Sequence, residues 1–154
     1  MIDLKIKYMH EDTKRLTISN IGNWIDVYAD DDYLLRKGEH KYIKLGFAME
    51  LPKGYEALVA PRSSTYKNWH LIMANSIGVI DTSYCGDGDE WHASVICLDT
   101  KDGITMNGEE YMPINRGDKI AQFRIIESMP QINLVEVDHL GNENRGGLGS
   151  TGKV

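Results

Sequence analysis

Apolar and polar residues alternate over short stretches along most of the chain. In residues 2–8, IDLKIKY, the apolar side chains occupy every second position, which is the period of a half-buried β-strand. Similar β-rich runs cover residues 42–45, 47–51, 55–59, 93–98, 119–126 and 132–137. Turn-forming clusters such as PKG, DDD, DGD, NGEE and NRGD separate these runs, as expected for chain reversals between strands.

No long segment has helical periodicity, and only residues 64–76, STYKNWHLIMANS, are compatible with a short helix or turn. Many short strands with frequent turns predict an all-β fold, a barrel or a sandwich. A length of 154 residues fits one domain. Composition changes only in the last dozen residues, so no linker divides the chain.

Charge and composition exclude several classes of function. The net charge of −6 argues against general nucleic-acid binding, which normally requires a basic surface. No apolar run approaches the roughly 18 residues of a membrane span, and the N-terminus lacks the apolar block of a signal peptide. We therefore expect a cytoplasmic protein with no nucleic-acid or membrane partner.

The cysteines and histidines do not form a metal-binding or disulfide pattern. Cys85 and Cys97 lie outside any C-x-x-C motif, and the five histidines are scattered without paired spacing. We expect both cysteines to be reduced packing residues and no transition metal held by protein ligands.

The C-terminal residues 144–154 read NRGGLGSTGKV, with four glycines among eleven residues. Gly147, Gly152 and Lys153 satisfy the G-x-x-x-x-G-K pattern of a phosphate-binding P-loop, but Val154 stands where that loop needs Ser or Thr. Taken alone, the segment is either a disordered tail or a segment that wraps a ligand with its backbone N–H groups.

Four internal stretches carry polar side chains beside apolar strands. PRSST at 61–65 supplies an arginine and three hydroxyls, which are donors suited to an anion. NSIGVIDTSYCGD at 75–87 places Asp81 after an apolar run that we interpret as a buried strand, where an idle carboxylate is costly. GDKIAQF at 117–123 places Gln122 in an apolar strand, and GNWIDVYA at 22–29 does the same with Asp26. In isolation, PRSST is more often a solvated turn, and Asp81 is also compatible with a turn-capping role.

In their order along the chain, from GNWIDVYA onward, the four stretches and the C-terminal RGGLGSTG resemble the five motifs of the trimeric dUTP pyrophosphatases (dUTPases), over nearly the whole chain. The resemblance implies a jelly-roll barrel for residues 1–143 and a flexible, glycine-rich, phosphate-binding arm for residues 144–154. It also implies a homotrimer whose active sites combine residues of all three subunits. The implied activity is hydrolysis of dUTP to dUMP and pyrophosphate, which limits uracil incorporation into DNA and supplies dUMP for thymidylate synthesis.

The resemblance also implies a role for each matching residue. Asp81 would be the general base that activates water for attack at the α-phosphorus, and Tyr84 would pack against the deoxyribose. The hairpin formed by the segment from Asn75 to Tyr84 would bind the uracil through Asn75, Gly78 and Ile80. Phosphate contacts would come from Arg62, Ser63, Ser64 and Gln122, and from Arg145, Gly149, Ser150 and Thr151 of the arm, whereas Leu148 of the arm would cover the uracil. Magnesium would be carried by the triphosphate, with Asp26 ordering its waters and no direct protein ligand.

Two features depart from the family pattern. Leu148 replaces the phenylalanine that stacks on the uracil, and Trp91 is our candidate to cover the base instead, with a place in the barrel core or a subunit interface as the equal alternative. The segment from Asp81 to Gln122 spans 122−81 = 41 positions, longer than is typical. The excess predicts a hairpin at 101–110 with a tight turn at Asn107-Gly108.

Two alternatives remain at this point. The first is a dCTP deaminase-type enzyme of the same fold, which uses a glutamate at the base. The second is a regulatory module whose nucleotide-bound state engages a protein partner, with residues 103–110 as the contact.

Overall fold

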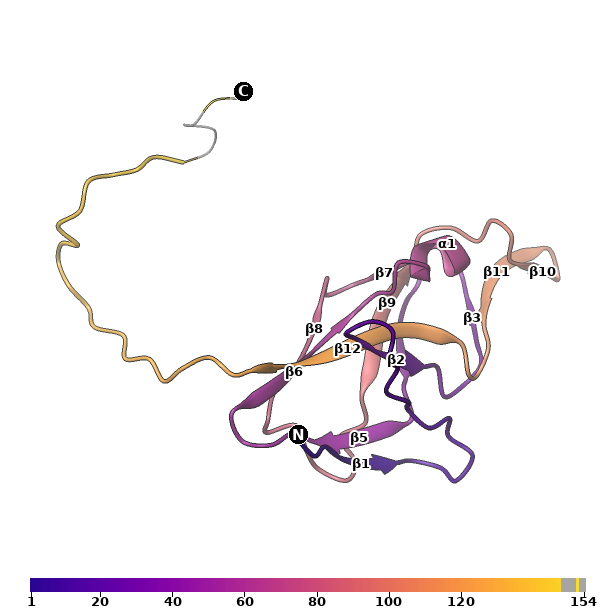
Figure 1. The fold of residues 1–154 in the computed structure, drawn as a ribbon. Coiled ribbons are helices and arrows are strands. Elements are labelled where there is room, and N and C mark those ends of the chain that lie inside the picture. The colour runs from indigo at the N-terminus through magenta and orange to yellow at the C-terminus, as the bar shows by residue number, and fades with distance from the viewer. Residues whose placement is uncertain (148–151, 153–154) are drawn as a thin grey trace.

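The computed structural model describes residues 1–147 and 152, and within them the chain is almost entirely β (Figure 1). This confirms the all-β prediction. The elements are β1 (Lys5–Tyr8), β2 (Ile25–Tyr28), β3 (Tyr33–Leu35), β4 (His40–Lys44), β5 (Phe47–Glu50), β6 (Tyr55–Ala60), α1 (Thr65–Trp69), β7 (Leu71–Met73), β8 (Gly78–Ile80), β9 (His92–Cys97), β10 (Ile104–Met106), β11 (Glu109–Ile114) and β12 (Lys119–Glu127).

The strands form four small sheets in which all pairs are antiparallel. The largest has the strand order β2-β12-β6-β8, and the others are β4-β9-β7, β10-β11-β3 and β1-β5. β12 is the longest strand and pairs on both sides, with β2 and with β6. All four sheets contribute buried residues to one apolar cluster.

Aromatic side chains fill the centre of the core. Phe47, Trp91 and Phe123 are fully buried, and the ring centroid of Trp91 lies 5.1 Å from that of Phe47 and 5.2 Å from that of Phe123. These spacings are typical of favourable tilted and edge-to-face aromatic pairs. The structure therefore corrects the prediction that Trp91 covers a bound base: its side chain is fully buried in the core, as in the alternative of a core residue.

The predicted hairpin and helix are both present. β10 and β11 pair across a turn in which Asn107 (φ 51°) and Gly108 (φ 78°) adopt left-handed backbone conformations, as a two-residue hairpin turn requires. This hairpin projects from one end of the body (Figure 1). α1 provides the short helix predicted within residues 64–76.

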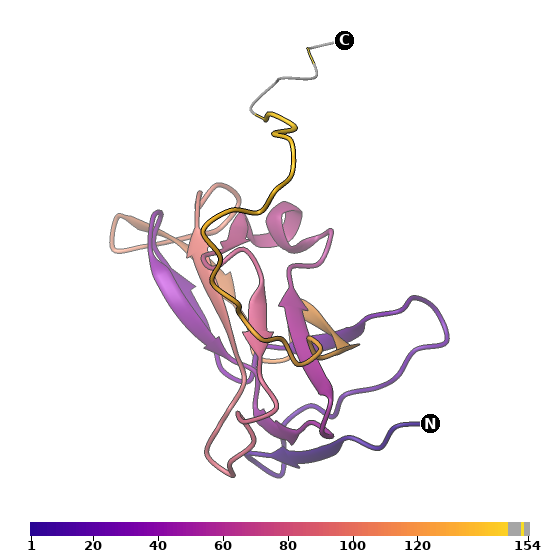
Figure 2. The same cartoon turned by 90° about the vertical axis from the view of Figure 1, so that its left-hand side faces the viewer.

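The predicted strand at 132–137 is absent. After β12, residues 129–147 run away from the body without regular structure and are exposed (Figures 1 and 2). The last main-chain hydrogen bond from this end of the described chain to the body joins Ser128 N–H to the carbonyl of Gly54, at 2.9 Å. The alternating apolar pattern is real, but a strand forms only beside a partner strand, and this chain offers it none within its described residues.

Among the residues described, no helix is long and apolar enough to cross a membrane.

Trp91→Ala should lower the free energy of unfolding by about 3–5 kcal/mol, because it removes the largest fully buried side chain and leaves a cavity. Trp91→Phe should cost less, because it keeps an aromatic ring there and because the indole N–H has no hydrogen-bond partner among the described residues. Denaturant unfolding at fixed protein concentration measures both changes. Tyr66→Ala, at a 54% exposed aromatic residue, is the control; a Trp91→Ala loss no larger than this control would contradict the core assignment.

Candidate active site

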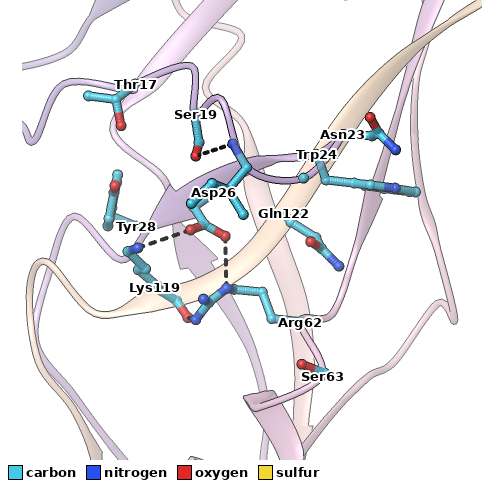
Figure 3. Close-up of a pocket in the computed structure, with 12 residues that line it drawn as sticks. Thr17, Ser19, Asn23, Trp24, Asp26, Tyr28, Arg62, Ser63, Lys119 and Gln122 are labelled. Atoms are coloured by element: carbon cyan, nitrogen blue, oxygen red, sulfur yellow. Dashed lines mark hydrogen bonds and ion pairs between the residues drawn. The ribbon is translucent and has the colours of Figure 1, made fainter.

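A polar pocket of about 490 Å³ opens beside the largest sheet (Figure 3). Its walls come from the loop before β2, from β2 itself, from the segment that follows β6, and from the first half of β12. The residues that line it are Thr17, Ser19, Ile21, Gly22, Asn23, Trp24, Asp26, Tyr28, Arg62, Ser63, Lys119 and Gln122. Four of these residues, Asp26, Arg62, Ser63 and Gln122, were predicted from the sequence to contact phosphate or to order magnesium waters.

Strand register brings the predicted residues together. Gln122 on β12 lies opposite Asp26 on β2 and opposite Ala60 at the end of β6. Arg62 and Ser63 follow Ala60 after the single residue Pro61. Three segments that are distant in sequence therefore reach one point because β12 pairs with both of its neighbours.

Asp26 forms ion pairs with two cations (Figure 3). Its Oδ1 lies 2.8 Å from Nε of Arg62, and its Oδ2 lies 3.1 Å from Nζ of Lys119. Because all three side chains are partly exposed, water screens these pairs and they add little to stability. Their main effect is geometric: one carboxylate holds a guanidinium and an ammonium at the wall of the pocket.

Gln122 and Ser64, two of the other residues predicted to contact phosphate, form hydrogen bonds within the 61–65 segment or to it. The Gln122 amide Nε2 donates to the carbonyl of Pro61 at 3.0 Å, so this half-buried amide has the partner that its strand position requires. The hydroxyl of Ser64 accepts from Nη1 of Arg62 at 3.3 Å. Ser63 is exposed and lines the pocket, whereas Ser64 does not.

Lys119 is a pocket residue that the sequence analysis missed. Positions 119 and 122 differ by an odd number, so in a regular strand their side chains would point to opposite faces. The pairing with β2 is irregular between Lys119 and Ala121, and such an irregularity redirects side chains. One signal in the sequence indicates Lys119 as a pocket residue: it begins the same strand that contains Gln122.

A second pocket, of about 420 Å³, brings together all four residues predicted to contact the nucleoside: Asn75, Gly78, Ile80 and Tyr84. It is more apolar than the first, and β4 and β9 contribute its other wall through Tyr42, His92 and Ser94. The backbone of the turn before β8 is tight, with Ser76 at φ 62°.

Tyr84 is held in place by its own loop. Its hydroxyl donates to the carbonyl of Glu90 at 3.0 Å, and Gly86 N–H donates to Oδ2 of Asp89 at 2.7 Å. Desolvation raises the pKa of the Tyr84 phenol, and the carboxylates of Asp89 and Glu90 act in the same direction. The ring is therefore neutral at physiological pH and presents an uncharged face.

Asp81 is exposed and lines neither pocket. The premise that it follows a buried strand is wrong: β8 is an edge strand, and Val79 at its centre is 58% exposed. Ile80 pairs with Ala57, so Asp81 lies level with Glu56, four residues from the Ala60 end of β6. At about 3.3 Å per residue, Asp81 is about 13 Å or more from the Arg62 segment of the same chain.

The predicted arm residues are only partly described. Arg145 is exposed and lies in the extended segment, away from both pockets. Leu148, Gly149, Ser150 and Thr151 lie outside the described residues.

The metal-binding capacity of the first pocket is limited. Among residues 1–147 and 152, no three His, Cys, Asp or Glu side chains group so as to hold a metal ion. Asp26 is the pocket's carboxylate, and both of its oxygens already contact cations. This donor set suits a magnesium ion that is carried by phosphate oxygens and keeps its waters, and does not suit direct coordination.

Comparisons with known proteins agree with this geometry. A family model described as dUTPase matches residues 24–152. The chain is 50% identical over 152 residues to the SPbeta prophage-derived deoxyuridine 5'-triphosphate nucleotidohydrolase of Bacillus subtilis (strain 168), covering 98% of this chain and 99% of that protein. It is 31% identical over 153 residues to the deoxyuridine 5'-triphosphate nucleotidohydrolase of Clostridium tetani, with 97% of each covered.

Solved structures show the same fold. A dUTPase of Staphylococcus bacteriophage 80alpha superposes with a TM-score of 0.76 at 20% identity and covers 99% of each chain. A mutant dUTPase from phage phi11 of S. aureus, described with a structural Mg(II) ion, has a TM-score of 0.73 at 22% identity and covers 90% of this chain and 99% of that one.

Lys119→Met should weaken binding of inorganic pyrophosphate by about tenfold, the typical effect of losing one hydrogen bond to a charged group. Calorimetric titration measures the affinity. Lys53→Met changes the net charge equally at an exposed residue outside the pocket and is the matched control. Equal losses in the two variants would mean that only overall charge matters.

Proposed function

This chain belongs to the dUTPase family and hydrolyses dUTP, and we propose that water attacks the α-phosphorus in sites shared between the subunits of a homotrimer. The observation that carries the proposal is the division of the predicted site residues between two pockets. One pocket contains the cations and amides for phosphate, and the other contains the turn and the tyrosine for a deoxynucleoside. The products are dUMP and pyrophosphate.

The first pocket binds the phosphates by exchange of partners. In the free chain, Arg62 and Lys119 neutralise Asp26. A bound triphosphate offers several anionic oxygens, so both cations gain stronger charge-assisted hydrogen bonds by turning to it. Gln122 and the hydroxyl of Ser63 add neutral donors. The cations are pre-oriented, which reduces the cost of ordering them when substrate binds.

The second pocket selects uracil and deoxyribose. The turn from Asn75 to Gly78 binds the base edge with main-chain groups, and its closeness leaves no room for the methyl group of thymine. Tyr84 packs a neutral ring against the sugar and excludes a 2′-hydroxyl. A site that pairs buried polar groups with one base discriminates strongly against analogues that leave those groups unpaired.

Asp81 is the general base. It lies beside Ile80, at the end of the strand that forms the nucleoside pocket. Its exposed carboxylate keeps an oxygen available to accept a proton from water. The products of attack at the α-phosphorus leave from opposite sides of this position, with dUMP in the nucleoside pocket and pyrophosphate in the phosphate pocket.

Sharing between subunits follows from the distance within one chain. Asp81 and the Arg62 segment lie toward opposite ends of β6, about 13 Å or more apart along the strand. The α-phosphate must contact both, so the Asp81 of one subunit serves the phosphate pocket of another. The apolar residues of 129–140, exposed in the single chain, supply further surface for the assembly. The arm residues Arg145, Leu148, Gly149, Ser150 and Thr151 then close over the phosphates.

A magnesium ion carried by the triphosphate would neutralise phosphate charge and orient the leaving pyrophosphate. Asp26 has no other anion beside it in the pocket. Once Arg62 and Lys119 turn to the phosphates, its two oxygens are free to accept hydrogen bonds from the waters of a hydrated cation. This switch explains how one carboxylate serves both the free and the bound state.

The comparisons do not favour a dCTP deaminase or a purely regulatory module. A protein partner for the β10–β11 hairpin is compatible with dUTP hydrolysis.

Incubation with dUTP and magnesium should yield dUMP and pyrophosphate, with little turnover of UTP or other deoxynucleoside triphosphates. Asp81→Asn should retain dUTP binding and lose about 10²–10⁴-fold in kcat, because an amide cannot accept the proton of the attacking water. Product chromatography and steady-state kinetics measure both, with Asp3→Asn as the control at a distant exposed aspartate. Release of orthophosphate and dUDP would rule out attack at the α-phosphorus.

Mixing two inactive variants tests the sharing of sites. Arg62→Ala and Asp81→Asn subunits, unfolded and refolded together in equal amounts, should recover about a quarter of wild-type activity, because one site in four combines an intact Arg62 with an intact Asp81 from its neighbour. Each variant refolded alone is the control. No recovery in trimers that contain both variants would place the complete site within one chain.

A further inference from the structure

The phosphate pocket is built from two segments that the backbone ladder does not connect. β6 and β12 pair up to Ala60 and Gln122. Beyond this point the 61–65 segment turns into α1, while Lys119 and Ala121 pair with β2 instead. The relative position of Arg62 and Lys119 therefore depends on side-chain contacts between the two segments.

The buried contact among these is made by Thr65. Its hydroxyl accepts from Arg62 N–H at 2.8 Å and donates to the carbonyl of Ile120 at 3.1 Å. Thr65 is 1% exposed. The two other cross-contacts, from Arg62 to the carbonyl of Lys119 and from Gln122 to that of Pro61, use side chains that face the pocket.

The carbonyl of Ile120 is free to accept from Thr65 because of an irregularity in the pairing of β12 with β2. Lys119 pairs with Tyr28 and Ala121 pairs with Val27, so Ile120 is the extra residue of the irregularity and has no opposite residue on β2. A buried carbonyl left out of a ladder needs another donor. The Thr65 hydroxyl is that donor, and its oxygen also accepts a hydrogen bond from Arg62 N–H. In the same turn, residues 62–65, Thr65 N–H donates to the carbonyl of Arg62 at 3.0 Å.

We propose that Thr65 is a positioning residue for phosphate binding: its hydroxyl sets the distance between the Arg62 segment and the Lys119 segment. It touches no phosphate, because it is buried beneath the pocket. When Arg62 and Lys119 leave Asp26 for a triphosphate, their direct link through that carboxylate is lost, and Gln122 turns an amide toward the ligand. The Thr65 bridge is the contact that persists in both states.

Three variants isolate the hydroxyl. Thr65→Val keeps the shape and removes both hydrogen bonds, Thr65→Ser keeps the hydroxyl, and Thr13→Val is a matched control. Thr13 is 4% exposed, and its hydroxyl likewise accepts from a backbone N–H, that of His10 at 3.2 Å, and donates to Asp30 at 3.2 Å, outside the pocket. Both valine variants should lose stability, so stability alone does not distinguish positioning from packing.

The measurements are calorimetric affinities for inorganic pyrophosphate and for deoxyuridine, together with KM and kcat for dUTP. Thr65→Val should weaken pyrophosphate binding and raise KM by about tenfold, since two buried polar groups lose their partner, while deoxyuridine affinity changes less than about twofold. Thr65→Ser should restore pyrophosphate affinity to within about twofold of wild type. Thr13→Val should bind pyrophosphate as the wild type does.

Three results would overturn the inference: wild-type pyrophosphate affinity in Thr65→Val, a Thr65→Ser variant as weak as Thr65→Val, or an equal loss in Thr13→Val. If Thr65→Val does not fold, Thr65→Ser against Thr65→Ala carries the same test, because the pair differs only in the hydroxyl oxygen. The inference rests on the proposed function, yet the two fail separately. Pyrophosphate binding tests the bridge without turnover, whereas absence of dUTP hydrolysis in the wild type would overturn the function alone.

Discussion

The two-sided pairing of β12 is the constraint on which the rest of the molecule depends. One face of this strand contributes Phe123 to the aromatic core, and the next residue toward the N-terminus, Gln122, faces the phosphate pocket. A slip of one residue would exchange these faces and place an amide in the core and a phenyl ring in the pocket. The packing of Phe123 against Trp91 and Phe47 therefore also fixes the chemistry on the opposite face.

Register alone does not hold the cations, and electrostatics completes the arrangement. The chain carries a net charge of −6 yet binds a highly charged anion. Asp26 makes this possible locally, because it pairs with both Arg62 and Lys119 at one wall of the pocket and its negative charge offsets the repulsion between the two cations. Since the three groups are partly exposed, their exchange for a phosphate does not require a buried charge to be left unpaired.

Much of this arrangement could be predicted from the sequence, and the failures have physical causes. Alternating and β-rich runs predicted β1, β4, β5, β6, β9 and β12. The family resemblance grouped most of the phosphate-side residues and all four nucleoside-side residues as the two pockets do, but Ser64 and Asp81 line neither pocket. Lys119 was missed because an irregularity of the β2–β12 pairing, invisible to a two-residue period, turns it toward Gln122. Trp91 was assigned wrongly because a large aromatic beside a polar turn serves a core and a ligand equally well, and only burial distinguishes the two.

The absence of a strand at 132–137 and the separation of Asp81 from the phosphate pocket have one feature in common: each segment lacks a partner within the described residues of the single chain. The pattern of residues 132–137 is correct for a strand, but Ile132, Leu134 and Val135 are 63%, 90% and 72% exposed in the single chain, a state that apolar side chains do not favour in water. Periodicity encodes the face that a segment will bury and does not encode which chain supplies the partner. In the homotrimer that we propose, a neighbouring subunit would supply both missing parts, a surface for this segment and an Asp81 for the phosphate pocket. Assembly and catalysis are then one requirement on the sequence.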